Sequence, residues 1–158
     1  MISKKSPAWL EVHIQLQDSM RKEIEIMREI LGNMHQEEYF LLSNDKVSRD
    51  HVVEERSLLL KRFNDIRQKR LLATETLENL SFPNADLEKA SLEECLLQSD
   101  ENSCETLLLR DQLVAIFNRI TMQNSRNQLL CKLSQHQSLS APKPVKKRSS
   151  LRQFLATR

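Results

Sequence analysis

The residue types that most often perform chemistry are scattered in this sequence. None of the four histidines follows a glutamate by three residues, so the Glu-x-x-His motif of carboxylate di-metal bundles is absent. The three cysteines form no C-x-x-C pair, and their odd number without a signal peptide favours free thiols in the cytoplasm. His51 and Glu55 lie four residues apart, a spacing that is common in any charged helix. We therefore expect no enzyme activity, no cofactor and no metal site.

Glycine and proline are placed so that they leave long stretches of chain free to form helices. The single glycine is Gly32, and the four prolines lie outside the apolar repeats. So little glycine excludes phosphate-binding loops, the nucleophile elbow of hydrolases and most tight hairpin turns. The 158 residues are 39% apolar, 29% charged and 4% aromatic, which suits a single domain with a narrow buried stripe. The sequence predicts an all-α protein: an elongated three-helix bundle at residues 1–137.

Two long helices are predicted at residues 7–42 and 45–81. The apolar residues of the first helix recur every three or four positions, as do those of the second, which also carries two arginines on its stripe. The first stripe comprises Trp9, Val12, Leu16, Met20, Ile24, Met27, Leu31, Met34 and Leu41. The second comprises Val52, Arg56, Leu59, Phe63, Ile66, Arg70, Ala73, Leu77 and Leu80. We expect the two helices to form an antiparallel hairpin.

The ends of these helices carry recognisable capping residues. Ser6 is expected to cap the first helix, with Pro7 in its first turn. Asn44 can adopt the left-handed conformation after the first helix, and Asp45 can cap the second. Gly32 lies inside the first stripe, where we expect a small packing contact or a slight bend.

A third helix is predicted at residues 104–137. Its apolar stripe is formed by Leu109, Leu113, Ile116, Phe117, Ile120, Leu130 and Leu133. Between Ile120 and Leu130 we expect the inward positions to be Asn124 and Asn127. Amides on such a seam fix the register of helices or pair with a partner.

The segments around the third helix have opposite charges. Residues 84–103 form an acidic connector, and residues 84–105 together carry a net charge of −6, while residues 138–158 carry +6. A capping box from Ser91 to Glu94 predicts a short helix in the connector, and the basic tail is expected to be disordered. The tail contains Leu151, Phe154 and Leu155, which can fold on binding a partner, although a merely solubilising tail is an equal alternative.

Partner binding is the function that this pattern favours. We expect the site to lie on the third helix and the tail, at Ile116, Ile120, Asn124, Asn127, Leu130, Leu133, Leu151, Phe154 and Leu155. Non-specific contact of the basic run with nucleic acid or an anionic membrane is less favoured than a solvated tail, because aromatic residues are nearly missing there. No segment is apolar for long enough to cross a bilayer. Self-association into a homodimer stays open.

The hairpin and the third helix resemble the FlgN family of flagellar and type III export chaperones. The likeness covers roughly residues 10–137. It rests on Glu37-Glu38-Tyr39-Phe40-Leu41-Leu42 before the turn, Glu54-Glu55-Arg56-Ser57-Leu58-Leu59 after it, and Asn124-Ser125-Arg126-Asn127 in the third helix. Asn44 stands at the turn where the family has glycine, and Gln128 stands where a glycine closes the family's signature.

The resemblance implies a cytoplasmic chaperone without enzyme activity. Such a protein binds the terminal helical segment of a secreted filament- or hook-associated subunit and delivers it to the export apparatus. The alternative is a coiled-coil scaffold or regulatory subunit of a secretion or other multiprotein complex, which would use the same surfaces without handing over cargo.

Overall fold

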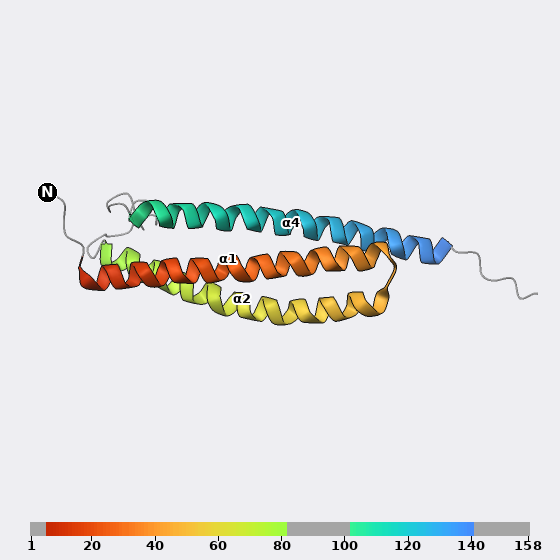
Figure 1. Cartoon of the computed structure of the whole chain (residues 1–158), viewed down its shortest axis with the longest axis horizontal. Helices are drawn as coiled ribbons and strands as arrows, with labels where there is room; N and C mark the ends of the chain where they lie inside the picture. The colour runs from red at the N-terminus through yellow and green to blue at the C-terminus, as the bar shows by residue number, and fades with distance from the viewer. Residues whose placement is uncertain (1–5, 82–101, 141–158) are drawn as a thin grey trace, which may run out of the picture.

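The computed structural model describes residues 6–81 and 102–140, which form three long helices (Figure 1). Helix α1 spans Pro7–Leu42, α2 spans Lys46–Ser81 and α4 spans Asn102–Ser140. The described residues are 96% helical and contain no strand, so the predicted all-α class is confirmed. The expected short connector helix and the disordered tail, with Leu151, Phe154 and Leu155, lie outside the described residues.

Helix α1 begins as its sequence predicts. The Ser6 hydroxyl accepts a hydrogen bond from the Trp9 backbone N–H at 3.2 Å, and Pro7 occupies the first turn. This cap satisfies one of the backbone donors that the first turn leaves without a helical partner.

The turn between α1 and α2 is short and also follows the expected capping pattern. Asn44 has a φ of 56°, in the left-handed region that asparagine tolerates better than most residues. This conformation lets the Asp45 N–H donate to the Phe40 carbonyl at 3.0 Å, which closes the end of α1. The Asp45 carboxylate then accepts a hydrogen bond from the Ser48 N–H at 3.1 Å and caps α2.

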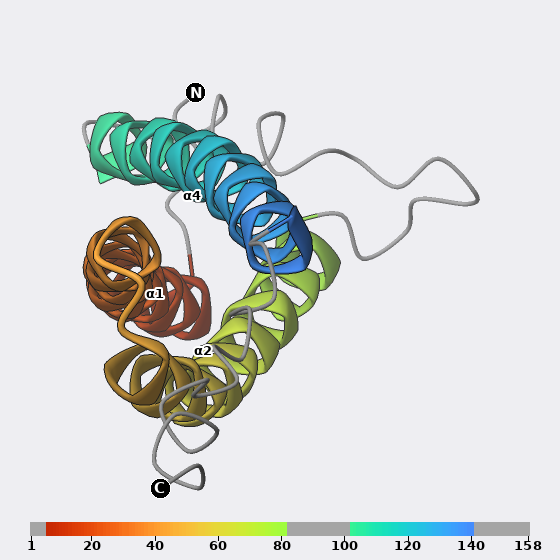
Figure 2. The same ribbon diagram turned by 90° about the vertical axis from the view of Figure 1, so that its right-hand side faces the viewer.

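Helix α1 is the central element of the molecule. It packs against α2 on one side and α4 on the other, whereas no Cα atom of α2 lies within 8 Å of a Cα atom of α4 (Figures 1 and 2). Helix α2 runs antiparallel to α1 and α4 runs parallel to it, so that α1 and α4 begin near the end of α2 (Figure 1). Because α1 packs against both neighbours, it contains more buried residues than α2 does.

The apolar core divides into three clusters along α1. At the end where α2 stops, Trp9, Leu16, Met20, Ile24, Ala73, Leu77 and Leu109 form one cluster that joins all three helices. Farther along, Ile26, Ile30, Met34 and Leu59 join α1 to α2, while Met27, Leu31 and Ile116 join α1 to α4. Phe63 and Ile120 pack against both of these clusters.

Three residues expected on the buried stripes are exposed instead. Phe117, Leu133 and Leu80 are each more than two fifths accessible to solvent. Phe117 follows the buried Ile116, and adjacent residues of a helix point about 100° apart, so the two cannot both face α1. Leu80 and Leu133 lie near helix ends, where the neighbouring helix covers less of the stripe.

Gly32 does not make the packing contact expected from its position. A Cβ atom built there would meet no side chain and no neighbouring backbone within 4 Å, and α1 continues through the residue without a break. The glycine therefore costs helix stability without a compensating close approach.

Candidate partner-binding surface at the hairpin end

The residues expected to bind a partner on α4 are divided between its inner and outer faces. Asn127 is only 3% exposed and Ile116 is buried as well, whereas Ile120 and Leu130 are half-buried. Asn124 is exposed and Leu133 is 52% exposed. Among these residues, only Asn124 and Leu133 are freely available to another protein.

The inward amides are Gln123 and Asn127, so the expectation for Asn124 was wrong. Inward positions on α4 alternate steps of four and three: Ile116, Ile120, Gln123, Asn127 and Leu130. Two successive steps of four, from Ile116 through Ile120 to Asn124, turn the side chain about 80° away from the stripe. Gln123 is buried for this reason, and Asn124 faces solvent.

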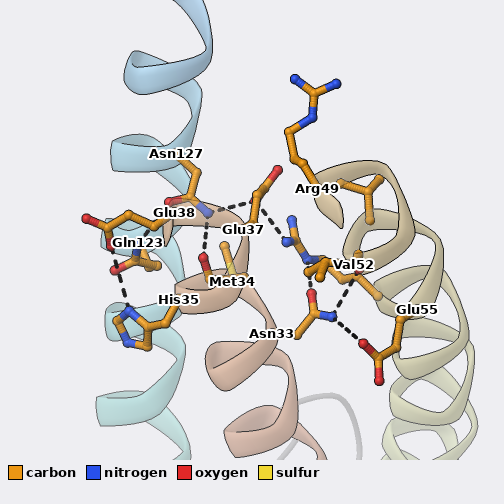
Figure 3. A network of polar contacts seen from close by, with 12 residues as sticks. Asn33, Met34, His35, Glu37, Glu38, Arg49, Val52, Glu55, Gln123 and Asn127 are labelled. Atoms are coloured by element: carbon orange, nitrogen blue, oxygen red, sulfur yellow. Dashed lines mark hydrogen bonds and ion pairs between the residues drawn. The ribbon is translucent and has the colours of Figure 1, made fainter. Parts of the chain in front are cut away.

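The Asn127 amide is saturated within the protein. Its Nδ2 donates to the Met34 carbonyl at 2.8 Å and to Glu37 Oε2 at 2.7 Å, and its Oδ1 accepts from Gln123 Nε2 at 2.9 Å (Figure 3). Met34 and Glu37 belong to α1, so this amide joins α4 to α1. Both of its N–H donors are used inside the protein and the side chain is buried, so its role is internal.

Glu37 extends the network from α4 to α2. The Glu37 Oε2 atom that accepts from Asn127 also accepts from an Arg56 guanidinium nitrogen at 2.8 Å. Arg56 Nε donates to Asn33 Oδ1 at 2.8 Å, and Asn33 Nδ2 donates to the Val52 carbonyl at 3.0 Å (Figure 3). All three helices therefore meet through a single carboxylate, which fixes their register.

Glu38 forms a second branch of the network on the α4 side. It accepts from Gln123 Nε2 at 2.6 Å and pairs with Arg126 Nε at 2.7 Å. His35 lies beside it, with Nδ1 3.8 Å from Glu38 Oε2 (Figure 3). Because Arg126 is largely exposed, this branch forms the outer edge of the network.

The ion pairs between glutamates of α1 and arginines of α2 were not predicted from the sequence, although a signal was present. Glu23 and Glu37 lie two heptads apart on α1, and Arg56 and Arg70 lie two heptads apart on α2. In an antiparallel hairpin this equal spacing brings Glu23 to Arg70 when Glu37 meets Arg56, and the structure contains both ion pairs. Matching the spacing of acids and arginines on the two stripes would have found them.

Outside this network, a groove lies between the hairpin turn and the last part of α4. We call the following residues, which line it, the hairpin-end surface: Leu42, Lys46, Arg49, Leu130 and Leu133. Leu42 is 65% exposed, so much of the apolar area in this groove is available to another protein.

The rim of the hairpin-end surface is basic. Hydrogen bonding to the Asp50 carboxylate raises the pKa of the Arg49 guanidinium above its ordinary value, so Arg49 stays charged at physiological pH. Lys46 adds a second cation at the first residue of α2. Arg49 is already paired with Asp50, so Lys46 supplies the positive charge that this surface adds to its leucine side chains, which suits a partner with apolar and acidic residues.

Metal-binding clusters and membrane-spanning helices are both absent from the described ranges. Within residues 6–81 and 102–140, no cluster of three histidine, cysteine, aspartate or glutamate side chains could hold a metal ion. In the same ranges no helix is long and apolar enough to span a bilayer.

Neither the family models nor the curated proteins nor the solved structures compared with this chain give a match.

Proposed function

We propose that the chain is a non-enzymatic export chaperone of the FlgN type. In this function it binds the amphipathic terminal segment of a secreted filament- or hook-associated subunit in the cytoplasm and delivers it to the export apparatus. The hairpin-end surface is the binding site. The observation that carries the proposal is the contrast between its exposed leucines and the saturated polar network directly behind them.

This contrast gives the surface a physical reason to bind reversibly. The amides and charges at the base already satisfy one another, so the fold does not depend on a partner. Covering Leu42, Leu130 and Leu133 with the apolar face of a helix removes their exposed area from water. Because only a few leucines take part, the partner is held weakly enough to be released for export.

The resemblance of residues 37–59 and 120–130 to the FlgN family supports this choice of partner. The stretches that resemble the FlgN family are the end of α1 before the turn, the part of α2 that follows the turn, and the part of α4 that contains Asn127. The segments that carry the resemblance therefore lie at or near the hairpin-end surface and the network behind it.

Two exposed leucines provide the test. In the variant Leu42→Asp with Leu133→Asp, the fold should persist, because both side chains are more than half exposed. Capture of the secreted subunit through its terminal segment should be lost. The matched control is Ile14→Asp with Leu58→Asp, which places two carboxylates on comparably exposed positions of α1 and α2 away from this surface.

The outcome also separates chaperone from scaffold. A chaperone recovers a secreted subunit at a defined ratio from native lysate, and mass spectrometry identifies the terminal segment as the bound region. Recovery of membrane-associated or ATPase components without any secreted protein would replace this proposal with the scaffold function.

A further inference from the structure

A second apolar groove opens near the middle of the molecule, far along α4 from the hairpin-end surface. Met27 of α1 forms its floor, Phe63 and Arg67 of α2 form one wall, and Leu113, Val114 and Phe117 of α4 form the other. We call these six residues the α2–α4 groove. The groove exists because α2 and α4 lie on different sides of α1, and no Cα atom of α2 lies within 8 Å of a Cα atom of α4 (Figure 2).

The α4 wall of this groove is apolar and exposed. Phe117 is 59% exposed and Val114 is 55% exposed, and both lie beside the inward residue Leu113. On α2, Leu60 and Leu71 are also exposed and lie seven and four residues from Arg67, a spacing that places them on the same side of the helix as Arg67. A strip of apolar side chains between two antiparallel helices is the surface on which a further helix packs in a four-helix bundle.

The charges in the groove favour an acidic partner. Arg70 is already neutralised by its ion pair with Glu23, whose side chain is nearly fully buried. Arg67 is exposed, and within the described residues no carboxylate is found in an ion pair with it. The lining residues therefore carry one uncompensated positive charge, set among apolar side chains.

We propose that the α2–α4 groove is a second binding site, which takes an amphipathic helix of a protein partner with a carboxylate beside its apolar stripe. The apolar residues of that helix pack between Phe63 and Phe117, and its carboxylate pairs with Arg67. Aromatic and arginine side chains in a groove of this kind supply a large part of binding energy at protein interfaces. The proposal rests on the binding of helical segments proposed above but assigns a separate surface.

The test uses the full chain and two synthetic peptides of three heptads each. The probe peptide has leucine at the two apolar positions of each heptad and glutamate on the flanks, and the control peptide has lysine in place of glutamate. Fluorescence anisotropy measures both dissociation constants at low salt. The probe peptide is expected to bind about tenfold more tightly than the control, an effect that added salt reduces.

Two substitutions locate the bound peptide. Arg67→Glu should reverse the preference and favour the lysine peptide, and Phe117→Ala should weaken binding of the probe peptide about tenfold. Lys69→Glu makes the same charge change on the opposite edge of α2, and Met122→Ala removes an even more exposed side chain from another face of α4. Both controls should leave the dissociation constant within about twofold of wild type.

Several outcomes would overturn the proposal. These are equal binding of the two peptides, no binding of either peptide, or an equal effect of Lys69→Glu and Arg67→Glu. A wild-type dimer that Phe117→Ala converts to a monomer would assign the groove to a second copy of the chain. Tighter probe binding in Glu93→Lys with Glu94→Lys would assign it to the chain's own acidic segment.

The two binding proposals can fail separately. If the Leu42→Asp, Leu133→Asp double variant no longer captures the secreted subunit, and the wild-type chain binds neither peptide, only the proposal for the α2–α4 groove is wrong. If peptide binding depends on Arg67, and the Leu42→Asp, Leu133→Asp double variant still captures the subunit, only the proposal for the hairpin-end surface is wrong.

Discussion

The two ends of the helical bundle are held together by different interactions. At the end where α2 stops, which we call the connector end, Leu16 and Leu77 are fully buried in the largest apolar cluster. Polar side chains also join the helices here: His13 Nε2 lies 2.8 Å from Thr106 Oγ1, and Trp9 Nε1 donates to Ser81 Oγ at 2.9 Å. At the hairpin end, a network of charged groups and amides joins the three helices, and leucines such as Leu42 and Leu133 are exposed to solvent.

This difference shows how a narrow bundle can combine stability with a binding surface. Apolar burial gives the larger share of stability but little information about register, since leucines can exchange places along a stripe. A carboxylate shared by Arg56 and Asn127 permits only one alignment of the three helices. We infer that the connector end provides most of the stability, while the hairpin end sets the alignment and keeps its leucines available.

The largest effect is expected from a leucine of the connector end. Leu77→Ala removes a side chain with no exposed surface and leaves a cavity, so the free energy of unfolding should fall by about 3–4 kcal/mol in urea titrations. Leu42→Ala, at the hairpin end, should change it by less than about 0.5 kcal/mol. Similar losses in the two variants would contradict the division of roles between the ends.

The next largest effect is expected from the centre of the hairpin-end network. Glu37→Ala leaves Arg56 and the Asn127 amide without their shared acceptor, at a cost of about 2–3 kcal/mol because both groups are largely buried. Glu25→Ala, on the exposed face of the same helix, is the control and should be nearly neutral. If Glu37→Ala is as mild as the control in urea titrations, the network does not hold the helices together.

Gly32 allows a change of opposite sign. Gly32→Ala should raise the free energy of unfolding by roughly 0.5–1 kcal/mol, because the new methyl group meets no neighbouring atom and the unfolded chain loses freedom. Thermal unfolding followed by circular dichroism measures the change. A lower melting temperature would mean that the backbone at this position is packed more closely than the structure indicates.

The smallest effect is expected at the turn and depends on pH. Hydrogen bonds from Ser48 lower the pKa of the Asp45 carboxyl below its ordinary value of 3.8. The stabilisation by this cap is therefore complete above that value and is lost as the pH falls through the lower pKa of the folded state. Asp45→Asn keeps a capping side chain that does not titrate, so wild type should lose more stability than the variant between about pH 6 and about pH 3. Parallel losses would contradict this role of Asp45.

Most of the fold could be predicted from local patterns. The residues Leu16, Met20, Ile24 and Met27 are buried as their spacing indicates, because a long helix without breaks repeats its apolar face regularly. The turn was predicted from Asn44, which tolerates the left-handed conformation, and from Asp45, whose carboxylate accepts a hydrogen bond from the nearby backbone. Such features need no knowledge of the rest of the molecule.

The candidate site could be predicted only in part. Local spacing could not decide whether Gln123 or Asn124 faces inward, since the answer depends on how α4 lies against α1. The placement of Phe117 in an open groove depends on the distance between α2 and α4, which no stripe on a single helix encodes. Sequence patterns therefore predicted the helices well and their exposed edges poorly.

We propose that the hairpin end captures a helical segment of a secreted partner, while the connector end only supports the fold. The most direct measurement is photo-crosslinking in cells, with a benzoylphenylalanine residue in place of Leu133 or, as the control, of Ile14. We predict that the Leu133 position crosslinks to the terminal segment of a secreted subunit and that the Ile14 position does not. Crosslinks of equal yield at both positions, or none to a secreted protein at the Leu133 position, would contradict the account.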